Sequence, residues 1–155
     1  MLLWRLSGLG YARATDGGYG LLFDGRWNTA GHAVTYAATS PSLCVLEKLV
    51  HVEDPALLPA LAMVTYEIPD DMPASHKPVD DLPVDWRRQE AMTQRIGDEW
   101  LSGMETALLF VPSAIVPIAG SPDRNVLMNA RHPAAAAIRI ARVEPFELDI
   151  RLLRE

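Results

Sequence analysis

The chain contains 155 residues, of which 49% are hydrophobic and 22% are charged, and its formal net charge is -6. A chain of this size and apolar content is expected to form one domain over residues 1–155 and to bury a core without disulfide or metal support. The excess of carboxylates excludes nucleic acid as the main partner, because phosphate backbones are bound by clustered cations.

Cysteine content and hydropathy predict a cytoplasmic protein that does not enter membranes. Cys44 is the only cysteine, which excludes an internal disulfide and fits a reducing compartment. The longest apolar stretch, residues 106–120, is shorter than the ~20 residues that span a membrane, and it contains two prolines. No cationic segment precedes the apolar N-terminal residues, so a secretory signal is not expected.

The first half of the chain predicts two strands and a helix. Residues 2–7 favour a strand, and the glycine-rich loop that follows ends at Gly25. Residues 33–37 have strand propensity. Thr39-Ser40-Pro41 is typical of a helix start, so a helix is predicted over residues 41–52. The side chains expected on its apolar face are Leu43, Leu46, Leu49 and Val50.

The second half completes a mixed α+β pattern. Its composition predicts, in order, a strand at 61–68, a surface loop at 69–85, a helix at 85–101, a buried strand at 107–111 and two strands at 138–143 and 146–152. Because strands and helices do not alternate regularly, we expect a single α+β domain rather than a doubly wound sheet. Gly8-Leu9-Gly10 lacks the third glycine of a dinucleotide-binding loop, and no Walker-type Gly-Lys-Ser/Thr occurs.

Three side chains are candidates for chemistry in the first half. Glu47 lies four residues after Leu43, so the helix turns its carboxylate towards the apolar face, where it must be paired, reach water or serve a function. Arg26, on a tight loop, suits bidentate recognition of a phosphate, although pairing with a surface acid is the alternative. Tyr36 could stack on a ligand ring or fill the core.

The second half of the chain offers Ser113 as a candidate, while the sequence supports neither a serine-hydrolase site nor a metal site. Ser113 ends the most hydrophobic strand, a position from which an exposed hydroxyl would project into a cleft. No Gly-x-Ser-x-Gly motif surrounds it, so a serine hydrolase is not supported. The four histidines lack metal-ligand spacing, and we expect no metal site. Cys44 is interpreted as a small core residue.

An ordered set of short segments extends from Trp4-Arg5 to Pro133. These segments are Gly25-Arg26-Trp27-Asn28, Val34-Thr35-Tyr36-Ala37, Leu46-Glu47, His51, Asp85-Trp86, Gly97-Asp98-Glu99-Trp100-Leu101, Val111-Pro112-Ser113, Asn125-Val126-Leu127-Met128-Asn129 and His132-Pro133. In this order they resemble the RES-domain family, the toxin half of bacterial RES–Xre toxin–antitoxin pairs. Two departures are Ala130, where the family usually has proline, and a longer loop at 118–124; both could alter acceptor or antitoxin contacts.

The resemblance implies an ADP-ribosyltransferase-like fold that binds NAD+ as a substrate, without a prosthetic group, and breaks its nicotinamide–ribose bond. Activities known in the family divide between degradation of NAD+ with water or phosphate and ADP-ribosylation of a target protein. The resemblance also implies an Xre-type antitoxin as the protein partner. The alternative is a non-catalytic interaction module of the same fold that binds a partner or a nucleotide.

The resemblance also implies roles for individual residues. Glu47 would stabilise the cationic ribose or hold its hydroxyl, Arg26 would clamp the pyrophosphate, and Tyr36 would stack on nicotinamide. Ser113 and Asn125 would orient the ribose or the amide. Arg5 is a second possible phosphate ligand, and Trp27 is grouped with Arg26 among the NAD+-binding residues. His51 and His132 are interpreted as structural.

Overall fold

The computed structural model describes residues 1–154. Its strands are β1 (Leu2–Gly8), β2 (Thr35–Ala38), β3 (Leu61–Glu67), β4 (Ala74–His76), β5 (Leu108–Pro112), β6 (Arg124–Met128) and β7 (Arg139–Phe146). Its α-helices are α1 (Gly18–Leu22), α2 (Pro41–Leu49) and α3 (Glu90–Gly103). Short 3-10 helices lie at Leu9–Tyr11, Pro55–Leu57, Val79–Asp81, Trp86–Arg88, Pro133–Ala137 and Ile150–Leu153.

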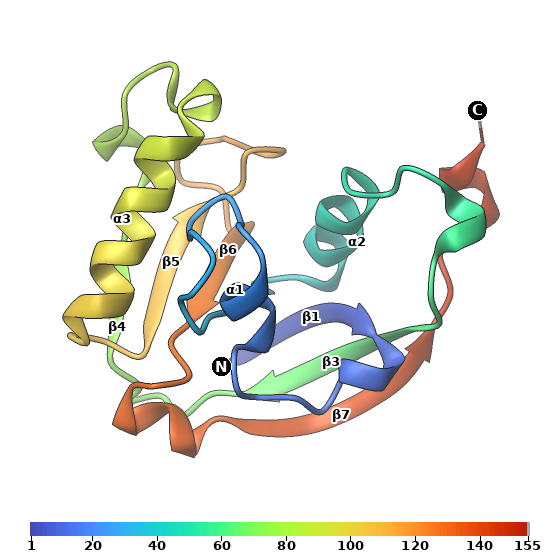
Figure 1. Cartoon of the computed structure of the whole chain (residues 1–155), viewed down its shortest axis with the longest axis horizontal. Helices are drawn as coiled ribbons and strands as arrows, with labels where there is room; N and C mark the ends of the chain where they lie inside the picture. Colours follow the sequence, from blue (N-terminus) through green and yellow to red (C-terminus); the bar gives the residue numbers. More distant parts are fainter. Residues whose placement is uncertain (155) are drawn as a thin grey trace.

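The described strands form one seven-stranded sheet in the order β4-β5-β6-β2-β1-β3-β7. Neighbouring strands are antiparallel except β4 and β5, which are parallel. Strands β1 and β2 share only the pair Trp4↔Ala38, whereas β1 and β3 pair along seven residues. The sheet therefore consists of two halves that run in different directions in Figure 1, joined at a single residue pair.

Helices α2 and α3 cover one face of the sheet. Under α3, Leu101 packs with Leu109, Val111 and Leu127. Under α2, the cluster consists of Leu43, Cys44, Ala38 and Met63. The opposite face carries the largest apolar cluster, which draws side chains from β1, β2, β3, β5 and β6. The predicted α+β class is confirmed, since three helices pack on one mixed sheet.

The start of α2 is the start that the sequence predicts. Ser40 has extended backbone angles, and its hydroxyl accepts a hydrogen bond from the main-chain N–H of Leu43. Pro41 occupies the first helical position, where no N–H is needed. The same Ser40 hydroxyl donates to Asp123 at 3.0 Å, which ties the helix start to the loop before β6.

The buried face of α2 differs from the predicted one. Leu43 and Cys44 are buried, but Leu46 is 40% exposed and Val50 is 60% exposed. The helix is rotated so that Glu47, one turn after Leu43, lies on the side that faces the sheet. The apolar periodicity correctly indicated a helix. The side that it predicted to be buried is only partly so, since Leu46 and Val50 face solvent.

Three elements near the end of the chain also differ from prediction. Strand β6 was not expected, although it is central in the sheet and Val126 and Leu127 are fully buried. The two strands predicted at 138–143 and 146–152 are instead one strand, β7, followed by a 3-10 helix capped by Asp149. Pro145 is tolerated inside β7 because this strand is at the edge of the sheet.

Replacing Ser40 with Ala is expected to destabilise the protein by about 1 kcal/mol, because the N-terminal cap of α2 and its bond to Asp123 are lost together. Urea unfolding measures this change. Ser42→Ala, at an exposed position of the same helix, is the matched control and should stay within about 0.5 kcal/mol of the unmodified chain. Equal stability of the two variants would contradict the role of the cap.

Candidate active site

The structure brings three of the predicted site residues into direct contact. Glu47 Oε1 accepts a hydrogen bond from Ser113 Oγ at 2.8 Å and another from Asn125 Nδ2 at 2.6 Å. Glu47 comes from α2, Ser113 follows β5 and Asn125 lies in β6. Both donors are neutral, and Glu47 forms no ion pair within residues 1–154. The carboxylate is thus oriented from two sides while its negative charge is not cancelled by a cation.

Ser113 differs from the exposed hydroxyl that the sequence predicts. Its side chain is fully buried. Besides donating to Glu47, its oxygen accepts the main-chain N–H groups of Ile115 and Val116 at 3.0 and 3.3 Å. These bonds shape the turn that follows β5. A hydroxyl engaged in this way acts on Glu47 and is not free to contact a ligand, so Ser113 is a positioning residue for the carboxylate.

A second cluster surrounds the hydroxyl of Tyr36. This hydroxyl donates to Asn28 Oδ1 at 2.6 Å and accepts the main-chain N–H of Trp27 at 3.1 Å. Burial raises the pKa of the Tyr36 phenol well above its ordinary value. The hydroxyl therefore stays protonated and holds the loop that carries Arg26, while the half-buried ring can still meet a ligand.

The register between β2 and β6 relates the two clusters. Tyr36 pairs with Leu127 and Ala38 pairs with Asn125. Side chains two residues apart on a strand share a face, so Tyr36 and Asn125 lie on the same face as diagonal neighbours, about 7–8 Å apart. Glu47 contacts Asn125 from this face. The candidate site therefore includes Glu47, Asn125 and the ring of Tyr36 along the covered face of the sheet.

Arg26 has hydrogen-bonding capacity that the protein leaves unused. Its Nη2 donates to the carbonyl oxygen of Arg87 at 2.8 Å, and its guanidinium carbon lies 5.7 Å from the centre of the Trp86 ring. Its Nη1 is buried and has no partner. A buried, unpaired donor on a cation is costly. An anionic ligand at this edge of the guanidinium would supply the missing acceptor.

Trp27 and Arg5 do not lie beside Glu47. Trp27 is 1% exposed and its ring packs against Trp86, so its side chain belongs to the core rather than to a ligand surface. Arg5 points to the other face of β1 and donates to Tyr66, Ser7 and two main-chain carbonyl oxygens. It forms no ion pair within the described residues.

Asn28 and Lys48 were not predicted individually as site residues. Asn28 was recognised only as part of a motif, yet it is fully buried and its amide donates to the carbonyl oxygens of Phe23 and Thr29. Lys48 follows Glu47 and is half-buried. Burial lowers its pKa, and the positive charge of Arg5 lowers it further. The positive charges of Arg5 and Lys48 therefore repel each other.

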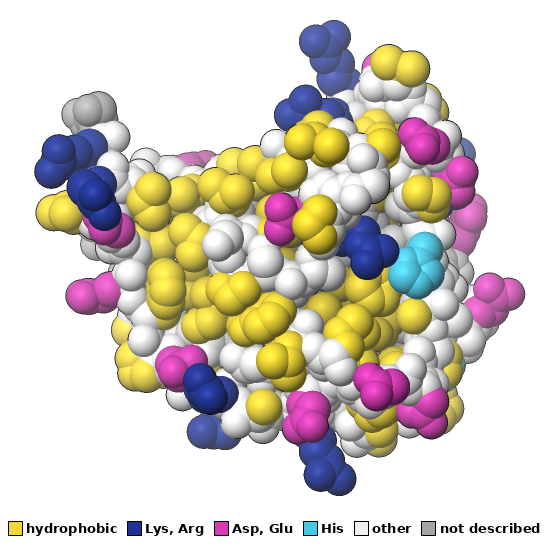
Figure 2. Space-filling model, turned by 180° about the vertical axis from the view of Figure 1, so that it is seen from behind, with side chains coloured by type: hydrophobic (Ala, Val, Ile, Leu, Met, Phe, Trp, Pro, Cys, Tyr) yellow, Lys and Arg dark blue, Asp and Glu magenta, His cyan; other side chains and the backbone are white. Residues whose placement is uncertain are grey.

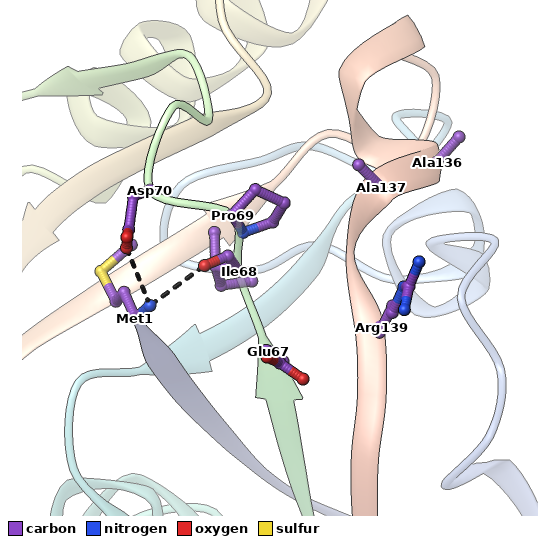
Figure 3. Close-up of a pocket in the computed structure, with 8 residues that line it drawn as sticks. All are labelled: Met1, Glu67, Ile68, Pro69, Asp70, Ala136, Ala137 and Arg139. Atoms are coloured by element: carbon purple, nitrogen blue, oxygen red, sulfur yellow. Dashed lines mark hydrogen bonds and ion pairs between the residues drawn. The ribbon is translucent and has the colours of Figure 1, made fainter.

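Two hollows lie away from these clusters. One, of about 410 Å³, lies beside the ammonium of Met1, which donates to Ile68 and is 3.5 Å from Asp70; Glu67 and Arg139 also line it (Figure 3). The other, of about 400 Å³, is lined among others by Thr35, Tyr66, Met128, Arg131 and His132. Neither hollow is lined by Glu47, Arg26, Tyr36, Ser113 or Asn125.

Neither the charge pattern on the face drawn in Figure 2 nor the metal-binding groups of the described residues indicate a competing site. Figure 2 shows the molecule from the side opposite to Figure 1. On this face, Lys and Arg side chains are scattered among apolar and acidic ones and form no continuous basic area. The described residues contain no group of three His, Cys, Asp or Glu side chains that could hold a metal ion. No described helix has the length and apolarity needed to cross a membrane.

Comparison with known proteins identifies the family. The model of the RES domain matches residues 2–149, so the chain belongs to the RES domain family, and the resemblance seen in the sequence is confirmed. A protein named Toxin Res from Pseudomonas putida is 41% identical over 154 residues, covering 98% of this chain and 99% of the relative. By family and by its relatives, the chain is a RES-family toxin.

Further relatives and one solved structure agree with this assignment. Toxin Res of Yersinia enterocolitica is 38% identical over 157 residues, with 98% and 99% of the two chains covered. The Prs ADP-ribosylating toxin of a Sphingobium species is 37% identical over 135 residues, covering 84% of this chain and 81% of the relative. A chain in the crystal structure of the M. tuberculosis MbcT–MbcA toxin–antitoxin complex has the same fold, with a TM-score of 0.68 and 15% identity over 94% of this chain and 83% of that one. The two chains therefore share this mixed α+β fold.

Cys44 is expected to resist alkylation in the folded protein. Burial raises the pKa of its thiol to about 12, so at pH 8 the reactive thiolate is far rarer than in the unfolded chain. Iodoacetamide labelling followed by mass spectrometry should be about a hundredfold or more slower in buffer than in urea. Similar rates in the two conditions would show that the thiol is accessible in the native state.

Proposed function

We propose that this toxin binds NAD+ in the cytoplasm, breaks its nicotinamide–ribose bond and transfers the ADP-ribose to water, phosphate or a cellular protein. The observation that carries the proposal is Glu47, a carboxylate fixed by two neutral donors and left without a cation. A negative charge held in this way stabilises the positive charge that develops on the ribose as the bond breaks.

In the proposed reaction, the bond between the ribose carbon and the nicotinamide nitrogen breaks, and its electron pair leaves with neutral nicotinamide. The resulting oxocarbenium-like ribose is attacked by an oxygen or nitrogen atom of the acceptor, which then loses its proton. Glu47 stabilises the cationic stage or holds a ribose hydroxyl. Ser113 and Asn125 keep the Glu47 carboxylate in place, since both bond to the same oxygen.

Arg26 and Tyr36 provide the remaining interactions with NAD+ in this proposal. The unpaired Nη1 of Arg26 is suited to a pyrophosphate oxygen, because charge-assisted hydrogen bonds to phosphate are strong and directional. The half-buried ring of Tyr36 lies on the same face as Asn125 and offers a surface for the cationic nicotinamide ring.

The acceptor and the protein partner are also proposals. The name of the Sphingobium relative, Prs ADP-ribosylating toxin, supports transfer to a protein. The structural neighbour is part of a toxin–antitoxin complex, which supports an antitoxin partner, expected to be of the Xre type. Free nicotinamide measured with and without candidate acceptors tests the reaction. Label from adenine-labelled NAD+ on a protein would identify protein transfer, and no nicotinamide under any condition would favour a non-catalytic interaction module.

Glu47→Gln is expected to lower nicotinamide release by about a hundredfold or more and to abolish growth inhibition. The amide oxygen of Gln can still accept hydrogen bonds from Ser113 and Asn125, so the fold should persist. Growth assays, nicotinamide release and thermal unfolding measure these effects. Glu53→Gln, at an exposed position after α2, is the control that should remain toxic. If well-folded Glu47→Gln still arrests growth, the role of this carboxylate is wrong.

Arg26→Lys is expected to raise KM for NAD+ by about tenfold or more, because an ammonium cannot reproduce the fork of a guanidinium. Arg88→Lys, at an exposed position, is the matched control. Steady-state nicotinamide release over a range of NAD+ concentrations measures both. An unchanged KM in Arg26→Lys would remove Arg26 from the substrate site.

A further inference from the structure

Helix α3 carries a segment to which the proposed reaction gives no role. Gly97-Asp98 belongs to the segments that resemble the family, and both residues face the loop of residues 25–29, called the Arg26 loop below. Helix α3 and this loop are about seventy residues apart in sequence and meet through main-chain atoms of the loop.

The first half of α3 binds two consecutive carbonyl groups of the loop. Thr93 Oγ1 donates to the carbonyl oxygen of Arg26 at 2.6 Å, and Thr93 is fully buried. Gln94 Nε2 donates to the carbonyl oxygen of Gly25 at 3.0 Å. These bonds fix the peptide groups on both sides of the Cα atom that carries the Arg26 side chain.

Gly97 allows the loop to approach the helix closely. A Cβ atom at this position would lie 1.6 Å from the carbonyl oxygen of Trp27 and 2.7 Å from its carbonyl carbon. No side chain fits in that space, and the obstructing atoms are main chain. The Arg26 loop can occupy its observed place only because residue 97 is glycine.

Asp98 binds the end of the loop with both carboxylate oxygens. Oδ1 accepts the main-chain N–H of Thr29 at 2.9 Å, and Oδ2 accepts the Thr29 hydroxyl at 2.6 Å. His32 Nδ1 lies 3.3 Å from Oδ1. One face of α3, formed by Thr93, Gln94, Gly97 and Asp98, thus contacts the loop at residues 26, 25, 27 and 29, respectively.

These contacts fix the main chain of the loop, while the guanidinium of Arg26 still has one unpaired donor. The hydroxyl of Tyr36 holds residues 27 and 28 from the sheet side, while α3 holds the main chain from the other side. The guanidinium makes one hydrogen bond, to Arg87, and keeps Nη1 unpaired. Rigid support for an unpaired cationic donor lowers the ordering cost of binding an anion.

We propose that Gly97 and Asp98 are positioning residues for anion recognition by Arg26. Their contacts set the main-chain conformation of the Arg26 loop and so the place of the guanidinium. The inference rests on the proposed function in that it takes the anion to be the pyrophosphate of NAD+. It makes α3 part of the binding machinery although neither residue is placed to touch the ligand.

The test compares four variants of the full chain. Asp98→Ala removes both acceptors for Thr29, whereas Asp98→Asn keeps an acceptor for the N–H and a group that can bond the hydroxyl. Thr93→Val removes the bond to the carbonyl of Arg26 with little change of volume. Glu99→Ala is the matched control, because Glu99 is the neighbouring acid of the same helix and is exposed.

The main measurement is binding of ADP-ribose by calorimetry, which needs no catalysis. We expect Asp98→Ala and Thr93→Val to weaken binding by about tenfold, as Arg26→Lys should, and Asp98→Asn to restore most of it. Glu99→Ala should bind like the unmodified chain. Amide hydrogen exchange should become faster over residues 25–32 in Asp98→Ala and remain slow in β5 and β6.

Kinetics separate positioning from a loss of folded protein. Misplacing Arg26 raises KM for NAD+, whereas partial unfolding lowers kcat in proportion to the missing protein and leaves KM unchanged. An Asp98→Ala chain with normal ADP-ribose affinity overturns the inference, as does an unmodified chain that binds no ADP-ribose. If the unmodified chain binds ADP-ribose but releases no nicotinamide, the proposed function fails, while weaker binding by Asp98→Ala still supports the inference.

Discussion

The arrangement of the molecule depends on one carboxylate oxygen. Oε1 of Glu47 accepts hydrogen bonds from Ser113 and Asn125, which belong to the half of the sheet that contains β5 and β6. Glu47 itself is on α2, which packs chiefly on β1 in the other half. Since β1 and β2 share a single residue pair, these bonds hold the two halves together above their joint. The candidate site is therefore also a connection between the halves of the fold.

Glu47 both connects the two halves of the sheet and belongs to the candidate site, and its neutral donors are compatible with both roles. A cation would bind the carboxylate more strongly but would cancel the charge on which the proposed chemistry depends. Two neutral donors orient the oxygen and leave its charge in place. Arg26, the cation among the candidate residues of this face, bonds instead to a neutral carbonyl oxygen. In an ordinary buried ion pair a cation both orients the carboxylate and offsets its charge. Around Glu47 the orienting groups are neutral, as the proposed stabilisation of a cationic ribose requires.

Local physics in the sequence predicted part of this fold and site. Ser40 and Pro41 marked the start of α2, and helical spacing placed Glu47 on the inner side one turn after Leu43. The same spacing failed for Leu46 and Val50, because burial is decided by the sheet that the helix meets and not by the helix alone. Strand β6 was missed because it begins with the polar pair Arg124-Asn125, and because its partner β2 is distant in sequence.

The contacts of the predicted site residues could not be derived from the sequence. Ser113 contacts the carboxylate as a buried support, and Trp27 fills the core, since both roles depend on contacts between residues far apart in the chain. Gly97 and Asp98 were recognised as part of a motif. Their contacts could not be predicted, because these contacts depend on the path of the Arg26 loop in the folded chain.

The long sequence separations in the site have a consequence for the order of folding. Glu47 is 66 residues from Ser113 and 78 residues from Asn125. Contacts that close such long loops form late, because the entropy of closure must be offset by other contacts first. Helix α2 and the pairing of β5 with β6 involve residues that are close in sequence, so both can form before Glu47 meets its donors. The carboxylate site therefore depends on the closure of two long loops and not on the local structure of α2 alone.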